Sequence, residues 1–152
     1  MKKAIVSIIA ILIFNGTAAA FDIATLDRVS VLMPKSQVIS LLGKPDQVDI
    51  MRGLKVEVYN VTNLNPMVST GCIYDGDSLK GQAFVFQGEM TKAAADRMKT
   101  LGFVLSEEKE GTYRLLGKDD DTGRPIMVHI LPDKGLTVVM IFEKDFYDRQ
   151  VK

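Results

Sequence analysis

Two side chains of this sequence could pair as nucleophile and base: its one cysteine, Cys72, and its one histidine, His129. A catalytic thiol needs a neighbouring group that stabilises the thiolate, and spatial neighbours cannot be read from a sequence. Cys72 stands beside apolar Ile73, and His129 lies within the apolar run Ile126–Leu131. We therefore interpret Cys72 as a buried, inert thiol and His129 as a structural residue. A thiol enzyme that uses Cys72 stays open as an alternative.

The acidic run Asp119–Asp121 is a second candidate for chemistry. An Asp-Thr-Gly tripeptide, typical of aspartic proteases, begins at Asp121, but that chemistry needs two carboxylates that share a proton in an apolar setting. Calcium needs about six oxygens at defined positions, and neither this run nor Asp75–Asp77 has that spacing. We predict solvated turns at both places, with no catalytic residue, no metal site and no cofactor.

Candidate partner-binding residues come from the segment Leu54–Asn60, in which apolar and polar residues alternate. This alternation predicts a half-buried strand, with Leu54, Val56 and Val58 on one face. The opposite face carries Lys55, Glu57 and Tyr59. Tyrosine supplies rigid, amphipathic contact area at interfaces. We therefore name Tyr59, Lys55 and Glu57 as partner-binding candidates; the alternative is that Tyr59 only shields its neighbours on the sheet.

Residues 1–20 have the features of a cleaved export signal. Lys2 and Lys3 precede the apolar run Ala4–Phe14, and small residues end the segment at Ala20. The run is far shorter than the ~20 apolar residues of a spanning helix, which would be the alternative. We predict cleavage after Ala20, a periplasmic or secreted location, and no stable membrane insertion of the mature chain.

Charge and length set further limits on the mature chain. Loss of residues 1–20 removes two lysines and no acids, so 19 basic and 19 acidic residues become 17 and 19, a net charge near −2. That balance gives no support for nucleic-acid binding. The 132 residues that remain of the 152 suit one domain with its own core.

A short amphipathic helix is predicted over Pro34–Leu42. Proline suits the first helical turn because its missing N–H would have no partner there. Apolar residues then recur at helical spacing. Gly43 can end the helix in a conformation with positive φ, and Pro45 prevents the helix from resuming.

Strand-like segments make up most of the remaining chain. They are Asp46–Met51, Leu54–Asn60, Val68–Tyr74, Lys80–Gln87, Phe103–Ser106, Tyr113–Gly117, Arg124–Leu131 and Leu136–Phe142. A second helix is predicted over Lys92–Leu101. The run Thr137–Phe142 is apolar on both faces, which indicates a central strand. The polar tail Glu143–Lys152 is expected to fray, or to dock through Phe146 and Tyr147.

The order of elements is a helix and four strands, followed by another helix and four strands. We predict an α+β fold in which helices pack on one face of an antiparallel sheet, as a single domain over residues 21–152. A further alternative is two tandem helix-plus-four-strand units, with repeats 21–87 and 88–152. Its support is that Met33–Lys35 resembles Met90–Lys92, and that each helix ends in Leu-Gly.

The helix segment resembles the start of the SmpA/OmlA (BamE) family of small envelope proteins, which carries the signature Met-Thr-Lys-x-x-Val-x-x-Leu-Leu-Gly-x-Pro. The matching residues are Met33, Lys35, Val38, Leu41, Leu42, Gly43 and Pro45. Pro34 replaces the threonine, and Leu32 replaces a glycine that is usual before the methionine. The tandem layout is also similar to the β-lactamase-inhibitor-protein fold.

The resemblance implies a protein without enzymatic activity that works by binding other proteins. The barrel-assembly members of the family carry a lipid anchor on a cysteine, and this chain has no cysteine near Ala20. We expect an exported protein-binding module of the bacterial envelope, similar to the accessory subunits of outer-membrane assembly. The first alternative is an inhibitor or immunity-type protein that binds a secreted or periplasmic hydrolase. The second is the thiol enzyme that uses Cys72.

Overall fold

A computed structural model describes residues 23–151, and the predicted signal segment, residues 1–20, lies outside the described residues. An eight-stranded antiparallel sheet dominates the structure, with the strand order β1-β2-β3-β4-β8-β7-β6-β5. The strands are β1 (Gln47–Met51), β2 (Leu54–Leu64), β3 (Met67–Asp75), β4 (Ser78–Gln87), β5 (Val104–Lys109), β6 (Thr112–Lys118), β7 (Pro125–Asp133) and β8 (Leu136–Glu143). Each of the predicted strand segments overlaps one of these strands.

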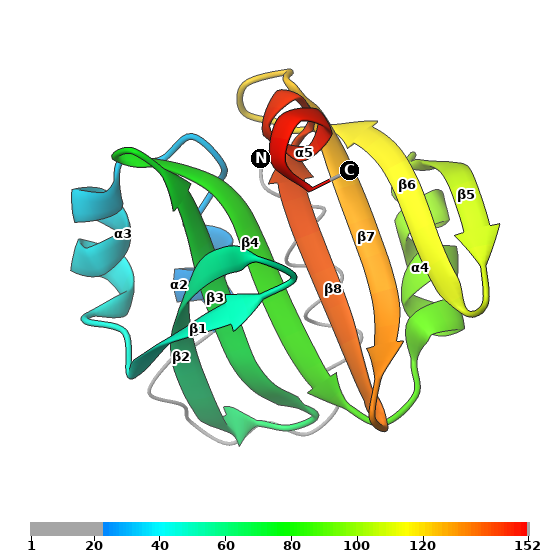
Figure 1. Cartoon of the computed structure of the whole chain (residues 1–152), viewed down its shortest axis with the longest axis horizontal. Helices are drawn as coiled ribbons and strands as arrows, with labels where there is room; N and C mark the ends of the chain where they lie inside the picture. The colour runs from blue at the N-terminus through cyan, green and yellow to red at the C-terminus, as the bar shows by residue number, and fades with distance from the viewer. Residues whose placement is uncertain (1–22, 152) are drawn as a thin grey trace.

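The antiparallel pair β4–β8 lies at the centre of the sheet (Figure 1). It joins the run β1-β2-β3-β4 to the run β8-β7-β6-β5. Its register pairs Gly81 with Phe142 and Gln87 with Leu136. Strand β8 is buried over almost its whole length, so the prediction of a central strand at Thr137–Phe142 is confirmed. Continuous apolar sequence is what a strand needs when both of its faces are covered.

Four short helices accompany the sheet within the described residues. They are α2 (Ile23–Asp27), α3 (Lys35–Leu42), α4 (Thr91–Thr100) and α5 (Lys144–Gln150). Helix α3 begins after Pro34 and ends at Gly43, whose φ is +79° and whose N–H donates to the carbonyl of Ile39 at 2.8 Å. The helix ends where the sequence predicts, and it begins one residue later than predicted, at Lys35.

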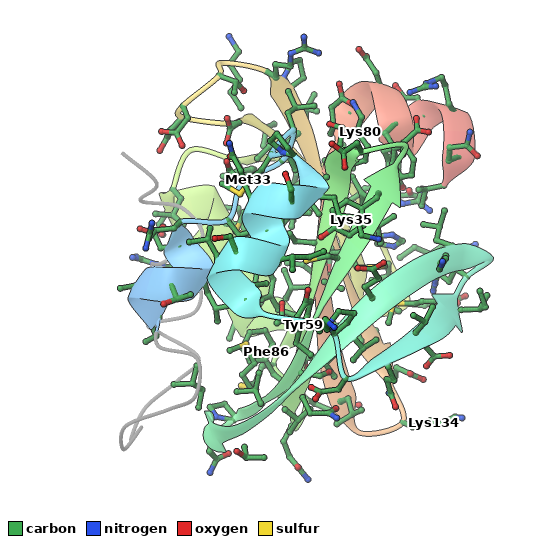
Figure 2. All side chains as sticks on the ribbon, turned by 90° about the vertical axis from the view of Figure 1, so that its left-hand side faces the viewer. Met33, Lys35, Tyr59, Lys80, Phe86 and Lys134 are labelled. Carbon is green, nitrogen blue, oxygen red and sulfur yellow. The ribbon has the colours of Figure 1, made fainter. Side chains whose placement is uncertain are left out.

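The helices lie on both faces of the sheet, which corrects the predicted α+β layering. Leu26, Val38 and Met98, from α2, α3 and α4, are buried in one apolar cluster, on what we call the first face. Phe146 and Tyr147 of α5 are buried in a separate cluster on the opposite side, the second face. Figure 1 shows α5 in front of the sheet and α4 behind it, and Figure 2 shows the same division nearly edge-on.

The expected layer of helices on one face, in two units, is therefore wrong. The tail that was expected to fray is helix α5, and only the alternative of docking through Phe146 and Tyr147 agrees with the structure. The physical reason is that β8 and its neighbours are apolar on both faces, so the second face also needs a cover. Phe142 supplies contacts for this cover, with ring centroids 6.3 Å from Phe146 and 5.6 Å from Tyr147.

The hairpin formed by β1 and β2 also covers part of the second face. Its turn, Arg52 and Gly53, has positive φ at both residues (51° and 81°), as a tight two-residue hairpin requires. Figure 1 shows this hairpin in front of the sheet. No helix among residues 23–151 combines the length and apolar character needed to cross a bilayer.

Candidate functional site

Two of the three residues proposed for partner binding are buried, which corrects the expectation that they face outward. Tyr59 is 1% exposed and Glu57 is 7% exposed, and of the three only Lys55 lies on the surface. The face of β2 that carries Glu57 and Tyr59 is the first face, and α3 lies over it (Figure 2). The alternation of β2 was predicted correctly, but a sequence does not reveal that a helix covers its polar side.

These buried residues form a polar cluster between α3 and the sheet. Lys35 of α3 makes an ion pair with Glu57, and its Nζ lies 4.9 Å from the centre of the Tyr74 ring. The Tyr59 hydroxyl donates to the carbonyl of Gly43 at 3.2 Å, at the end of the helix. Hydrogen bonds and ion pairs of this kind fix the position of α3 on β2, so the cluster has a structural role.

Cys72 lies in the same cluster and is 1% exposed, which confirms the prediction of a buried thiol. Burial, with a smaller effect of the Glu57 carboxylate, raises the pKa of Cys72 to about 12, although a hydrogen bond with Tyr74 acts in the opposite direction. Burial also raises the pKa of Tyr59 to about 12. A thiol with such a pKa is protonated at neutral pH and is a poor nucleophile.

His129 lies on the opposite face of the sheet from Cys72. The register β3–β4–β8–β7 places Cys72 in one row with Gln82, Ile141 and Val128, and His129 follows Val128 on the other side of the strand. Its ring contacts Tyr147 of α5 edge-on, with centroids 6.3 Å apart. The sheet itself separates the two side chains, so they do not form a nucleophile–base pair.

The acidic run Asp119–Asp121 lies in the loop between β6 and β7, as predicted. The carboxylate of Asp119 accepts hydrogen bonds from the Thr122 backbone N–H at 2.9 Å and from its hydroxyl at 2.6 Å. The loop ends where Lys118 pairs with Pro125. In the part of the chain that the structure describes, no group of three or more His, Cys, Asp or Glu could hold a metal ion.

Sequence reasoning missed an apolar groove at the β5 edge of the sheet. It has a volume of about 530 Å³ and runs from the end of α4 to the β6–β7 loop. Its lining residues are Leu101, Gly102, Phe103, Val104, Leu116, Gly117, Lys118, Asp120 and Pro125. Leu116 and Val104 are register partners and lie on the same face at its rim.

The large exposed apolar side chains of residues 23–151 all lie at the two edges of the sheet. Val48 (54% exposed) and Ile50 (66%) belong to edge strand β1, while Val104 (67%) and Leu116 (38%) belong to β5 and its neighbour β6. Lys55 is the register partner of Ile50, so it belongs to the β1 edge. The alternation of β1 was visible in the sequence, but which strands would become edges was not.

Comparison of the chain with models of protein families, with curated proteins and with solved structures finds no match. Function is therefore inferred from the described residues themselves. Their geometry offers two kinds of surface: exposed apolar side chains at the sheet edges, and a hollow on the second face lined by charged residues such as Arg52, Glu107 and Arg114. The edges are typical of contact with another protein, because isolated monomers rarely leave apolar strand edges uncovered.

Proposed function

We propose that this chain is an exported, non-enzymatic protein-binding module of the bacterial envelope that binds its partner through the β5 edge. The observation that carries the proposal is the apolar groove of about 530 Å³ beside an edge strand that has one free side. An extended segment of a partner can pair with such an edge and place an apolar side chain in the adjoining groove.

The two halves of β5 differ in how well they can accept a partner strand. Its second half, Glu107–Lys109, is charged, and a bulge separates Leu105 from Glu107. Charges and bulges are devices that discourage strand addition. The first half carries Val104, which is 67% exposed at the rim of the groove. The favoured docking position is therefore the Val104 end of β5.

Two features support the remaining parts of the proposal. Residues 1–20 have the charged start, apolar run and small-residue end of an export signal. The buried Cys72, with its pKa raised to about 12, and its separation from His129 across the sheet argue against the thiol-enzyme alternative. The partner we propose is another envelope protein, as for the accessory subunits of outer-membrane assembly that the Met33–Pro45 segment resembles.

The test is a pull-down with a matched pair of edge variants. The chain Phe21–Lys152 is immobilised, exposed to detergent-solubilised envelope and periplasmic extract, and compared with Val104→Asp and Ile50→Asp. Both substitutions put a carboxylate on an exposed edge position, so neither should disturb folding. We expect a stoichiometric envelope protein to be retained by the unmodified chain and by Ile50→Asp, and to be lost with Val104→Asp.

The other outcomes contradict defined parts of the proposal. If only Ile50→Asp lost the retained protein, the contact would be assigned to the β1 edge. Retention of a single soluble hydrolase would replace the envelope partner by the inhibitor alternative. No retained protein at micromolar concentration would contradict the protein-binding function itself.

A further inference from the structure

His129 is a buried histidine without a hydrogen-bond partner. Its side chain is 2% exposed, and neither Nδ1 nor Nε2 has a partner in the structure. Buried polar groups nearly always have one, because an unsatisfied group loses its bonds to water without replacement. Tyr147 approaches His129 only edge-on through its ring, and the Tyr147 hydroxyl is itself buried without a partner. Neither His129 nor Tyr147 therefore satisfies the buried polar atoms of the other.

The ring of His129 lines a hollow of about 200 Å³ on the second face. Strands β5, β6 and β7 contribute Glu107, Lys109, Thr112, Arg114 and His129, and the loop between β5 and β6 contributes Glu110. Arg52 reaches the hollow from the turn of the β1–β2 hairpin, more than 50 residues away in the sequence. A second hollow of about 440 Å³, which reaches α5, shares Glu107 and Arg114 with the first.

The donors in the hollow exceed the acceptors. Arg114 is the cross-strand neighbour of His129, and one of its terminal nitrogens pairs with Glu107. Its Nε is buried without an acceptor. Arg52 and Lys109 make no ion pair with any residue that the structure describes. Three cationic side chains therefore face two carboxylates, Glu107 and Glu110, around a neutral imidazole.

We propose that this hollow binds a small, singly charged carboxylate, held by Arg114 and Arg52 beside the ring of His129. Guanidinium groups match carboxylates in geometry and form charge-assisted hydrogen bonds with them. One negative charge balances the one excess positive charge of the lining residues. A doubly charged anion would meet the repulsion of Glu107 and Glu110, and a metal cation would meet that of the arginines.

Glu107 and Lys109 of β5 line this hollow, but none of its lining residues lines the apolar groove at the Val104 end of β5 that is proposed for protein binding. Burial first, and then the positive charges of Arg114 and Arg52, lower the pKa of His129 to about 4, so its ring is neutral at pH 7. A bound anion supplies the opposite charge next to the same ring. The ligand therefore stabilises groups that are unpaired without it, which is the usual source of affinity at a buried polar site.

The proposal can be tested by NMR, because His129 is the single histidine of the chain and an untagged protein gives one imidazole signal. Sodium acetate is added at pH 7, with sodium chloride at equal ionic strength as the reference. We expect a saturable shift of the His129 ring resonances with acetate and none with chloride. Arg52→Gln, whose side chain is exposed and outside the core, should weaken acetate binding about tenfold.

Three further variants and a second anion test the site. Arg114→Gln should weaken binding at least as much, whereas Lys44→Gln, an exposed cation outside the hollow, should leave it unchanged. A shift that rises linearly without saturation, or equally with chloride, would overturn the site. Inorganic phosphate that saturates at a lower concentration than acetate would overturn the assignment to a singly charged ligand. Val104→Asp, which alters the β5 edge, should leave the acetate titration unchanged.

Discussion

The ring of Phe103 lies directly against the backbone of Gly117, so that a Cβ at residue 117 would come within 2.4 Å of two ring carbons. Phe103 follows helix α4 and is 6% exposed, and both residues line the apolar groove. This close approach ties the end of α4 to strand β6. The shape of the groove therefore depends on a position that only glycine can occupy without moving the ring.

Gly117→Ala is expected to destabilise the protein by about 1–3 kcal/mol, because the ring of Phe103 must shift to admit the methyl group. Urea unfolding followed by circular dichroism measures the change, with Lys118→Ala on the same strand as the control. The same variant should lose affinity for the partner at the β5 edge, because the groove is reshaped. An unchanged midpoint of unfolding would show that the ring has room to move.

The ion pair between Lys35 and Glu57 predicts a second stability effect. Glu57→Gln keeps the shape of the side chain but leaves the Lys35 ammonium without its counter-charge. Glu57 is only 7% exposed, so water cannot fully replace the lost interaction. We expect a loss of about 1–3 kcal/mol in the free energy of unfolding. The control is Asp96→Asn, which breaks an exposed pair with Lys92 and should cause no measurable change. Equal losses of unfolding free energy for the two substitutions would contradict the inference that the buried pair holds α3 on β2.

The raised pKa of Cys72, about 12, predicts an unreactive thiol. Alkylation by iodoacetamide at pH 8 should be about a thousandfold slower in the folded chain than in urea, since the thiolate fraction falls tenfold for each unit of pKa. Because the folded pKa lies above the unfolded value, this group favours the folded state below the unfolded thiol pKa. That contribution is lost as the pH rises toward 12. Fast alkylation of the folded protein would reopen the thiol-enzyme alternative.

The lowered pKa of His129 predicts a stability change at acid pH. Burial, Arg114 and Arg52 bring the pKa from 6.5 to about 4. The folded pKa is below the unfolded one, so the stabilising contribution is present above pH 6.5 and is lost as the pH falls toward 4. The His129 contribution to this loss is about 3 kcal/mol, and it is measured as the excess of the change in unfolding free energy between pH 7 and pH 4 over that of a variant without the imidazole.

The matched control for this pH effect is His129→Gln, which cannot take up a proton. Both proteins share the same carboxylates, so the difference between their pH dependences is due to residue 129. The free energy of unfolding of the variant should therefore change less between pH 7 and pH 4 than that of the unmodified chain. Parallel pH dependences would contradict the lowered pKa. NMR titration of the His129 ring gives the pKa directly.

Local chemistry in the sequence determined the secondary structure and its limits. Pro34 and Gly43 bound helix α3, the alternation from Leu54 to Tyr59 forms β2, and the Arg52–Gly53 turn joins β1 to β2. Apolar surroundings predicted the burial of Cys72. These features depend on backbone preference and on residues adjacent in the chain, and a sequence displays both.

The tertiary structure alone decided which faces were covered and which residues met. Tyr59 and Glu57 are buried because α3 folds over them, and Val104 is exposed because β5 became an edge. Arg52 reaches the hollow beside His129 because the β1–β2 hairpin lies over the second face. Strand order and the placement of helices arise from contacts between distant segments, so periodicity in the sequence fixes the two faces of each strand but not what covers them.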